Sequence, residues 1–351
     1  MAVQPDTAPR ALADLEAVVR TEALEPLWAQ PDFPTEPVTA VRPYRWRWSQ
    51  VRPRLLEAGA LQPLGKEGAD RRVLAFKNPG LPQGIATTQT LSAAVQLVHA
   101  TERAPSHRHT PAAIRFVIEG RRTYTLVNGE PCWMEPGDLI LTPNWSWHGH
   151  VNEGDGPMMW LDALDVPLVF ALNQMFFEDF PGDQQPITQA HEESLSRYGL
   201  GSLRPTWVQP RDATAPLLSY KWTDTEPQLR ALAEVEGSPF DGVALEYTNP
   251  VTGGPALPTL GCRIQLLRPG ERTRAHRHTA SAIYHVVRGH GATTIAGERL
   301  DWAPGDVIAL PSWAWHAHEN ASGAEEAILF SVTDEPVLRA VGLFREQERE
   351  A

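Results

Sequence analysis

The chain has 351 residues, of which 42% are hydrophobic and 21% charged, and its formal net charge is −12. This length favours about two domains, the composition is typical of a soluble globular protein, and the acidic balance argues against a general nucleic-acid binder. No run of apolar residues is long enough to cross a bilayer, so we expect no membrane partner.

Residues 1–84 are expected to form a helical and extended N-terminal arm. Apolar residues at Leu12, Leu15, Val18 and Val19 have helical spacing, and a Pro-rich stretch follows them. The first twenty residues lack the apolar core of a secretory signal, and the chain has only two cysteines, too few for a disulfide framework. These features predict a cytoplasmic protein.

One segment of the arm, RPYRWRWSQVRPR at residues 42–54, mixes five arginines with three aromatic rings. Such a mixture can mark single-stranded nucleic-acid binding. In an acidic chain we favour the other interpretation, that the rings pack and the arginines pair with acids, and we predict no nucleic-acid partner.

An internal repeat dominates the rest of the chain. The string HRHTPAAIRFVIEG begins at His107 and HRHTASAIYHVVRG begins at His276, an offset of 169 residues. PGDLILTPNWSWHGH begins at Pro136 and PGDVIALPSWAWHAH at Pro304, an offset of 168 residues. Two long strings that recur in the same order indicate a tandem duplication of one domain.

Each copy has the pattern of short β-strands. Ile114–Ile118, Tyr124–Val127 and Leu139–Leu141 are rich in β-branched or aromatic residues, and glycine, proline, asparagine and aspartate separate them. The pair Asn128-Gly129 predicts a two-residue hairpin turn. Many short strands with regular turns indicate a sandwich or a barrel.

The repeats divide the remaining chain. We predict the two β-domains at 85–170 and 241–333, with the first as the catalytic one. A linker at 171–240 is Pro-rich and contains a candidate helix around Pro227–Val235. The tail, 334–351, is predicted to be an amphipathic helix.

The histidines of the first copy have the spacing of metal ligands. His107 and His109 would share one face of a strand, because side chains alternate along a strand, and His148 follows the Pro-Gly-Asp turn. A lone histidine is more often an ordinary packed residue, but a pair with a third histidine, twice in one chain, favours a metal site. Three neutral imidazoles leave coordination positions open, which suits Fe(II) that must bind substrate and O₂.

These motifs resemble the paired cupin signatures. Ala113 and Ala282 occupy the position, four residues after the second histidine, where cupins commonly have a glutamate. With that departure, the strings HRHTPAAIRFVIEG, WSWHGHVNEG, MMWLDALDVPLV and PSWAWHAHEN resemble the gentisate and salicylate 1,2-dioxygenase family, 5-nitrosalicylate 1,2-dioxygenase-like members included. The resemblance covers most of the chain. It implies a mostly β bicupin fold of two tandem jelly-roll barrels, Fe(II) on three histidines, and a homotetramer.

The resemblance also implies an activity. It is an extradiol-type cleavage of a 2-hydroxybenzoate between the carboxyl-bearing and hydroxyl-bearing carbons, with both atoms of O₂ entering the product. The partners are then a small aromatic acid and O₂. Three alternatives remain: a gentisate 1,2-dioxygenase giving maleylpyruvate, a Mn(II) decarboxylase or isomerase, and a non-catalytic metal-binding bicupin. The Mn(II) enzymes usually keep the cupin glutamate, and intact histidines argue against a non-catalytic protein.

Arg115 is the candidate clamp for the substrate carboxylate. It follows His109 by six residues, an even spacing that predicts an inward side chain. A buried guanidinium needs a partner, and a carboxylate substrate would bind it bidentately. The structural alternative is a buried ion pair with Asp162. The family resemblance further implicates four pocket residues: Arg71, Gln96, His150 as a proton shuttle, and Asp162.

Two departures from the family pattern bear on the substrate. Gly149 stands where the family has the aspartate of WHDH, and Ser92 stands where it has tyrosine or tryptophan, four residues before Gln96. Both changes remove bulk. With Ala94 as a third specificity position, they predict an enlarged pocket that favours a 5-substituted salicylate, for example 5-nitrosalicylate, over gentisate.

The second copy keeps His276, His278 and His316 but has Tyr284 where the first has Arg115. Without a carboxylate clamp, we expect this barrel to be structural or silent. Its histidines have two interpretations, a second metal site or packed remnants of the duplication.

Overall fold

The structure is a computed structural model, and it divides into two units, residues up to Val38 and residues from Thr39 onward. In the first unit, α1 (Leu12–Thr21) confirms the predicted helix, and the 3-10 turn η1 (Leu27–Ala29) follows it. Neither element has a buried residue. The structure describes residues 11–65, 68–82, 84–203, 205–207 and 214–349.

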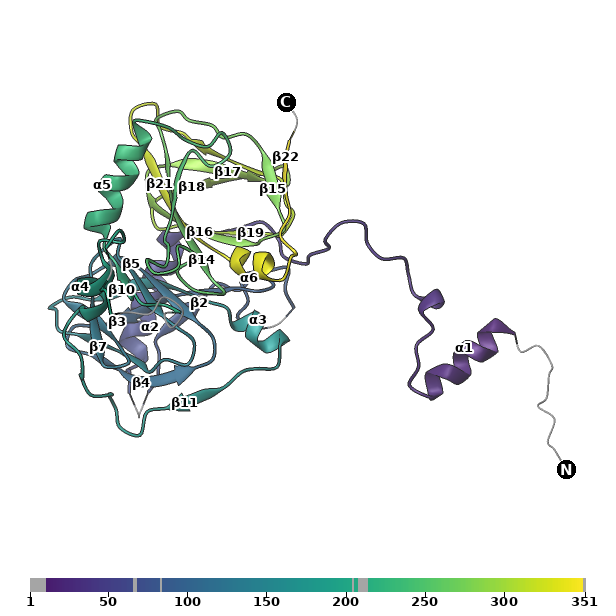
Figure 1. The fold of residues 1–351 in the computed structure, drawn as a ribbon, viewed down its shortest axis with the longest axis horizontal. Coiled ribbons are helices and arrows are strands. Elements are labelled where there is room, and N and C mark those ends of the chain that lie inside the picture. The colour runs from purple at the N-terminus through teal and green to yellow at the C-terminus, as the bar shows by residue number, and fades with distance from the viewer. Residues whose placement is uncertain (1–10, 66–67, 83, 204, 208–213, 350–351) are drawn as a thin grey trace. The chain divides into compact units, whose positions relative to one another are not determined.

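The first barrel, blue to teal in Figure 1, carries the early strands of the chain. It pairs a six-stranded sheet of order β12-β8-β5-β10-β3-β2 with a five-stranded sheet of order β11-β4-β9-β6-β7. The three strands predicted from the sequence are confirmed, and the hairpin turn between β6 and β7 has the positive φ angles expected at Asn128 (46°) and Gly129 (88°). Its strands are β2 (Val73–Ala75), β3 (Ser92–Val98), β4 (Arg103–His109), β5 (Ala113–Glu119), β6 (Thr123–Val127), β7 (Glu130–Met134), β8 (Leu139–Thr142), β9 (His148–Asn152), β10 (Met158–Leu164), β11 (Phe177–Asp179) and β12 (Ser219–Tyr220).

The second barrel repeats this topology strand for strand. Its sheets have the orders β1-β19-β16-β21-β14-β13 and β22-β15-β20-β17-β18, which match the first barrel position by position. The tandem duplication is therefore present in the fold. The strands are β1 (Tyr44–Trp46), β13 (Val243–Glu246), β14 (Gly261–Leu267), β15 (His276–His278), β16 (Ala282–Arg288), β17 (Gly291–Ile295), β18 (Glu298–Trp302), β19 (Val307–Leu310), β20 (His316–Asn320), β21 (Ala327–Thr333) and β22 (Glu346–Glu348).

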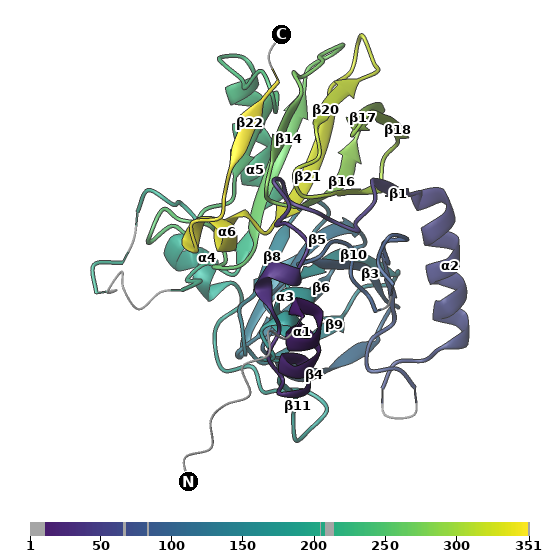
Figure 2. The same ribbon diagram turned by 90° about the vertical axis from the view of Figure 1, so that its right-hand side faces the viewer.

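Two strand–helix segments are exchanged between the barrels, and we call them the crossed straps. In the first strap, β1 joins the sheet of the second barrel, while α2 (Trp48–Leu61) packs on β3 of the first (Figure 2). In the second strap, β12 joins the first barrel, while α5 (Trp222–Ala233) packs on β13 and β14 of the second. Segments outside the predicted barrel boundaries therefore complete both barrels.

The Pro-Gly-Asp turns hold the starts of the strap helices. The Trp48 N–H donates to Asp306 Oδ1 at 2.8 Å, and the Trp222 N–H donates to Asp138 Oδ1 at 2.8 Å. Neither N-cap residue makes a side-chain capping bond of its own. Each carboxylate thus satisfies an N–H that would otherwise lack a partner at a helix end.

The arginine- and aromatic-rich segment lies in the first strap. Arg45 Nη1 is 3.6 Å from Asp306 Oδ2, and Arg52 Nη2 is 3.0 Å from Glu119 Oε1. The Trp46 ring lies 5.3 Å from that of Phe76. The interpretation that the rings pack and the arginines pair with acids is confirmed for Trp46, Arg45 and Arg52.

The linker and the tail differ in part from the sequence-based expectation. α3 (Val166–Ala171) ends the predicted first β-domain, the linker contains α4 (Glu193–Tyr198), and α5 begins five residues before the predicted helix. The prediction of a helical tail is wrong beyond α6 (Glu335–Ala340), because Gly342 adopts φ +73° and β22 then pairs with β15. No helix in the described residues is long and apolar enough to span a membrane.

Candidate metal centre

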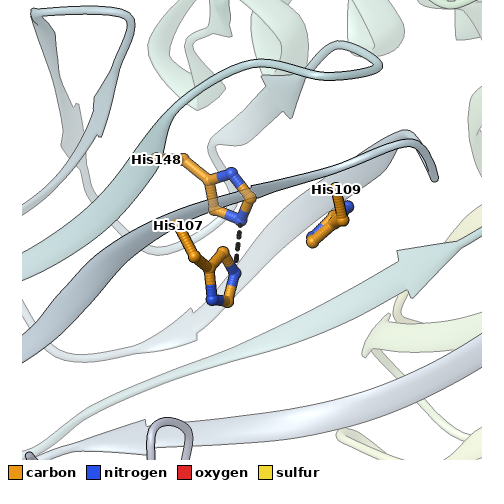
Figure 3. A group of neighbouring side chains, drawn as sticks. All are labelled: His107, His109 and His148. Atoms are coloured by element: carbon orange, nitrogen blue, oxygen red, sulfur yellow. Dashed lines mark hydrogen bonds between the residues drawn. The ribbon is translucent and has the colours of Figure 1, made fainter. Parts of the chain in front are cut away.

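Three histidines of the first barrel converge in its interior (Figure 3). His107 and His109 lie on the same face of β4, and His148 begins β9 directly opposite His107. One ring nitrogen from each lies within 4.8 Å of the others, and the group is buried or nearly so. The expectation that the three side chains meet is confirmed.

Contacts at the Nδ1 atom of each histidine fix the orientation and the tautomer of the three rings. His107 Nδ1 is 3.0 Å from Asp70 Oδ2, and the Nδ1 atoms of the other two rings are 2.8 and 2.9 Å from the carbonyl oxygens of Pro111 and Ser146. A carbonyl can only accept, so those Nδ1 atoms carry the proton. Each Nε2 then offers a lone pair, as a metal ligand must.

The arrangement of these nitrogens fits a cation. His107 Nε2 and His148 Nε2 are only 3.0 Å apart, and with both protons on Nδ1 the two lone pairs face each other. Arg71 Nη2, at 3.2 Å from His107 Nε2, can donate a hydrogen bond to one of these lone pairs. Burial lowers the pKa of His109 to about 4 and that of His148 well below its usual value, so the rings are neutral.

A cavity of about 340 Å³ opens beside the histidines. Three alternate residues of β3, Ser92, Ala94 and Gln96, line it, and all three are positions that the family resemblance assigned to the pocket. Gln96 is 2% exposed, and its Nε2 has no hydrogen-bond partner among the described residues. Sequence reasoning missed the apolar part of the wall, which comes from β2, the segment before β3, the end of β10 and the start of α3: Val73, Ala75, Ile85, Leu164 and Val166.

Arg115 and Asp162 face each other across β5 and β10 on the cavity wall. Arg115 Nε lies 3.3 Å from Asp162 Oδ1, and its Nη1 donates to Thr142 Oγ1. Asp162 Oδ1 also accepts from Trp160 Nε1 at 3.1 Å. Burial raises the pKa of Asp162 to about 6 and lowers that of Arg115. The buried ion pair that the sequence offered as an alternative therefore exists, although Arg115 reaches the cavity from β5 and not from the strand of His109.

Arg71 adds a second cation to the same cavity. It lies in the arm, and its Nη1 donates to the Asp70 backbone oxygen at 2.8 Å. Burial lowers its pKa to about 10, so it remains charged at neutral pH. With two arginines and one acid, Asp162, the charged lining of the cavity is net positive and suits an anion.

Two residues that were expected at the pocket, His150 and Gly149, do not line the cavity. The His150 ring is buried 4.8 Å from the Trp160 ring, with Nδ1 3.0 Å from Thr125 Oγ1, and it is not among the residues that line the cavity. Gly149 alternates to the outside, where a Cβ would meet Ser106 Oγ at 2.6 Å. The prediction that Gly149 enlarges the pocket is wrong, because neighbours of an inward residue on a strand point outward.

The second barrel repeats the histidine cluster. His276, His278 and His316 also bring one ring nitrogen each within 4.8 Å of the others. His276 and His278 border a smaller cavity of about 210 Å³, which Tyr284 also lines.

Known proteins are similar to this chain in both sequence and structure. A cupin domain family matches residues 94–164 and 263–333. The 5-aminosalicylate 1,2-dioxygenase of a Comamonas species is 44% identical over 98% of this chain and 92% of its own. The 1-hydroxy-2-naphthoate 1,2-dioxygenase of Nocardioides sp. (strain KP7) is 42% identical over 87% of this chain and 78% of its own. The crystal structure of a salicylate 1,2-dioxygenase from Pseudaminobacter salicylatoxidans superposes with a TM-score of 0.88 at 34% identity, and the match covers 98% of this chain and 99% of that one. Another structure of that enzyme is an adduct with gentisate.

Proposed function

Because the chain belongs to the gentisate and salicylate 1,2-dioxygenase family of bicupin proteins, we propose that it is an Fe(II)-dependent dioxygenase of 2-hydroxybenzoates. The ring would open between the carboxyl-bearing and hydroxyl-bearing carbons, with both atoms of O₂ entering the product. The observation that carries this proposal is the three-histidine cluster beside a cavity with two buried arginines.

The protein's own residues hold and orient the metal. His107, His109 and His148 would bind it through Nε2, while Asp70 and two backbone carbonyls keep the protons on Nδ1. Bound Fe(II) supplies the redox chemistry and the open positions that O₂ and the substrate oxygens need.

The cavity wall would bind the aromatic acid. Arg115 and Arg71 offer guanidinium groups to the carboxylate, and Asp162 orients Arg115 by the ion pair at 3.3 Å. Gln96 Nε2, buried without a partner, would donate to a substrate oxygen. We retain His150 as a proton shuttle, because its buried Nε2 also has no partner among the described residues.

For the ring substituent, we propose a 5-substituted salicylate, with gentisate as the alternative. Ser92 and Ala94 leave one side of the cavity open, and the apolar wall suits an aromatic ring. The relative named for 5-aminosalicylate supports this class of substrate.

Oxygen uptake by the Fe(II)-loaded enzyme tests the proposal. The panel contains salicylate, gentisate, 5-aminosalicylate, 5-nitrosalicylate and 1-hydroxy-2-naphthoate, with benzoate as the control that lacks the ortho hydroxyl. We expect the highest kcat/KM for a 5-substituted salicylate and no turnover of benzoate. Ser92→Trp should lower kcat/KM for that substrate about tenfold or more and spare salicylate. Absence of uptake with every 2-hydroxybenzoate would reject the activity, and a clear preference for gentisate would reject the substrate assignment.

We also infer that the enzyme is cytoplasmic and works as a homo-oligomer, with the tetramer of the family resemblance as the expected state. Large apolar side chains exposed in the N-terminal unit, Trp28 and Phe33 among them, support association with another surface. Light scattering on the full chain measures the assembly, and a monomer at micromolar concentration would reject it.

A further inference from the structure

We propose that the second barrel holds its own divalent transition-metal ion through His276, His278 and His316, in a site that takes no part in ring cleavage. His276 and His278 share one face of β15, and His316 begins β20 opposite His276. This is the same placement on the same two strands as in the first barrel. The proposal is independent of the substrate assigned to the first site.

The rings of this cluster are also set up as ligands. His278 Nδ1 donates to the Ala280 oxygen at 2.8 Å, and His316 Nδ1 donates to the Ala314 oxygen at 3.1 Å. Both carbonyls hold the same positions, two residues after and two residues before the histidine, as those in the first barrel. The two Nε2 atoms therefore carry lone pairs directed at the cluster.

An unpaired buried nitrogen provides independent support for an occupant. His316 is 2% exposed, and its Nε2 has no hydrogen-bond partner among the described residues. A buried polar atom without a partner costs free energy comparable to a lost hydrogen bond. A metal ion bound by His316 Nε2 would remove that cost.

The charges around the second cavity favour a cation. Its lining carries three acids, Asp241, Glu335 and Glu346, against two arginines, Arg263 and Arg339, so it is net negative where the first cavity is net positive. Glu335 pairs with both arginines, at 2.7 and 2.6 Å, and Asp241 and Glu346 offset the positive charge that this one carboxylate leaves over. A free anion would meet little uncompensated positive charge here.

The second cavity cannot accept the aromatic acid in the manner of the first. Arg263 occupies the position in the second barrel that Ala94 occupies in the first. Arg263 pairs with Ser331 across β14 and β21, as Ala94 pairs with Asp162 across β3 and β10. A long side chain thus replaces the small residue that leaves room for the ring, and Tyr284 replaces the clamp. The cavity shrinks from about 340 to about 210 Å³. The metal would instead stabilise β15 and β20, and through β15 the tail strand β22.

Co(II) binding to the metal-free full chain tests the proposal, because the visible absorbance of Co(II) reports coordination without any turnover. After removal of loose metal by gel filtration, we expect two equivalents on the wild type by mass spectrometry. His109→Ala should retain one, His278→Ala should retain one, and the double variant should retain none. His109→Ala is the decisive protein, because metal that it retains must lie outside the first site.

Each outcome decides the question. One equivalent on the wild type together with none on folded His109→Ala overturns the proposal, as does an unchanged count in folded His278→Ala. If circular dichroism shows that His278→Ala is unfolded, His316→Gln replaces it with the same expectation. Fe(II)-loaded His278→Ala should keep oxygen uptake within about twofold of the wild type. If the wild type takes up no oxygen with any 2-hydroxybenzoate, the first-site function fails, while the Co(II) count still decides the second site.

Discussion

Asp70 is a residue whose importance comes from its contact with His107 and not from contact with substrate. Its carboxylate lies 3.0 Å from His107 Nδ1 and is 42% exposed on the side chain. Replacing such a partner of a metal-bound histidine typically weakens metal binding by about 10- to 100-fold. We expect Asp70→Ala to weaken Fe(II) or Co(II) binding at the first site within this range. Glu178→Gln, which alters an exposed acid paired with Arg108 nearby, is the control and should not change the affinity.

Arg115 has both a structural partner and a proposed substrate, and a double variant separates the two roles. Arg115→Met alone leaves Asp162 unpaired and should destabilise the fold. Arg115→Met/Asp162→Asn removes both charges, so most of the stability should return while binding of 2-hydroxybenzoates weakens about 100-fold or more. Isothermal titration on the metal-loaded double variant measures the affinity. Wild-type affinity in that protein would refute the clamp.

Asp162 also makes stability depend on pH. Its pKa is about 6 in the fold, raised by burial from the ordinary 3.8. Between pH 4 and 6 the native state therefore holds more protons than the unfolded state, so stability falls as pH rises through this range. Relative to Asp162→Asn, the wild type should lose up to about 3 kcal/mol over the range, measured by urea unfolding. Parallel curves for the two proteins would contradict the raised pKa.

At the residue scale, strand alternation explains what the sequence could predict. His107 and His109 were correctly expected to face inward, because they lie two residues apart on one strand, whereas Ser92 and Gln96 were expected at the pocket only from the family resemblance. The same rule, applied to Gly149, would have placed it outside. Asp70 was not predictable, since its contact with His107 joins the arm to β4, and no periodicity links those segments.

At the scale of elements, the helix caps from the Pro-Gly-Asp turns are open to test. Asp306→Ala removes the acceptor for Trp48 N–H and should cost about 1–3 kcal/mol in the free energy of unfolding. Asp306→Asn keeps an oxygen acceptor and should cost less. Chemical unfolding of the two variants measures the difference. Equal losses would mean that the charge, which also faces Arg45 at 3.6 Å, matters more than the cap.

The straps show why element boundaries were harder to predict than element types. Each strap helix begins with a tryptophan and has a proline as its sixth residue. These are Trp48 and Pro53 in α2 and Trp222 and Pro227 in α5, so the two helices are offset by 174 residues. The duplication therefore extends upstream of the strings found in the sequence. Few identical residues mark this part, because each helix buries only a narrow face, with Leu55 and Leu229 at 0% exposure.

At the scale of the whole molecule, neither barrel is complete without the other's strap. Residues from Thr39 onward form one unit, and stacked rings of Phe116 and Phe330, 4.3 Å apart, join the two barrels. We expect residues 39–207 and 208–351 to fail to fold when expressed alone, and to form a metal-binding complex when coexpressed. Co-purification and Co(II) absorbance measure this. A monomeric, folded fragment would show that the exchange is dispensable.

The crossed straps also bear on how such a chain could arise. Each strap precedes one barrel in the sequence and completes the other in space. An ancestor with one barrel would have made the same contacts by swapping straps between two identical subunits. Joining the two genes would have turned an association that depends on protein concentration into one within a single chain. In such a chain the second half would act as an internal scaffold for the first, and its own pocket would be free to diverge.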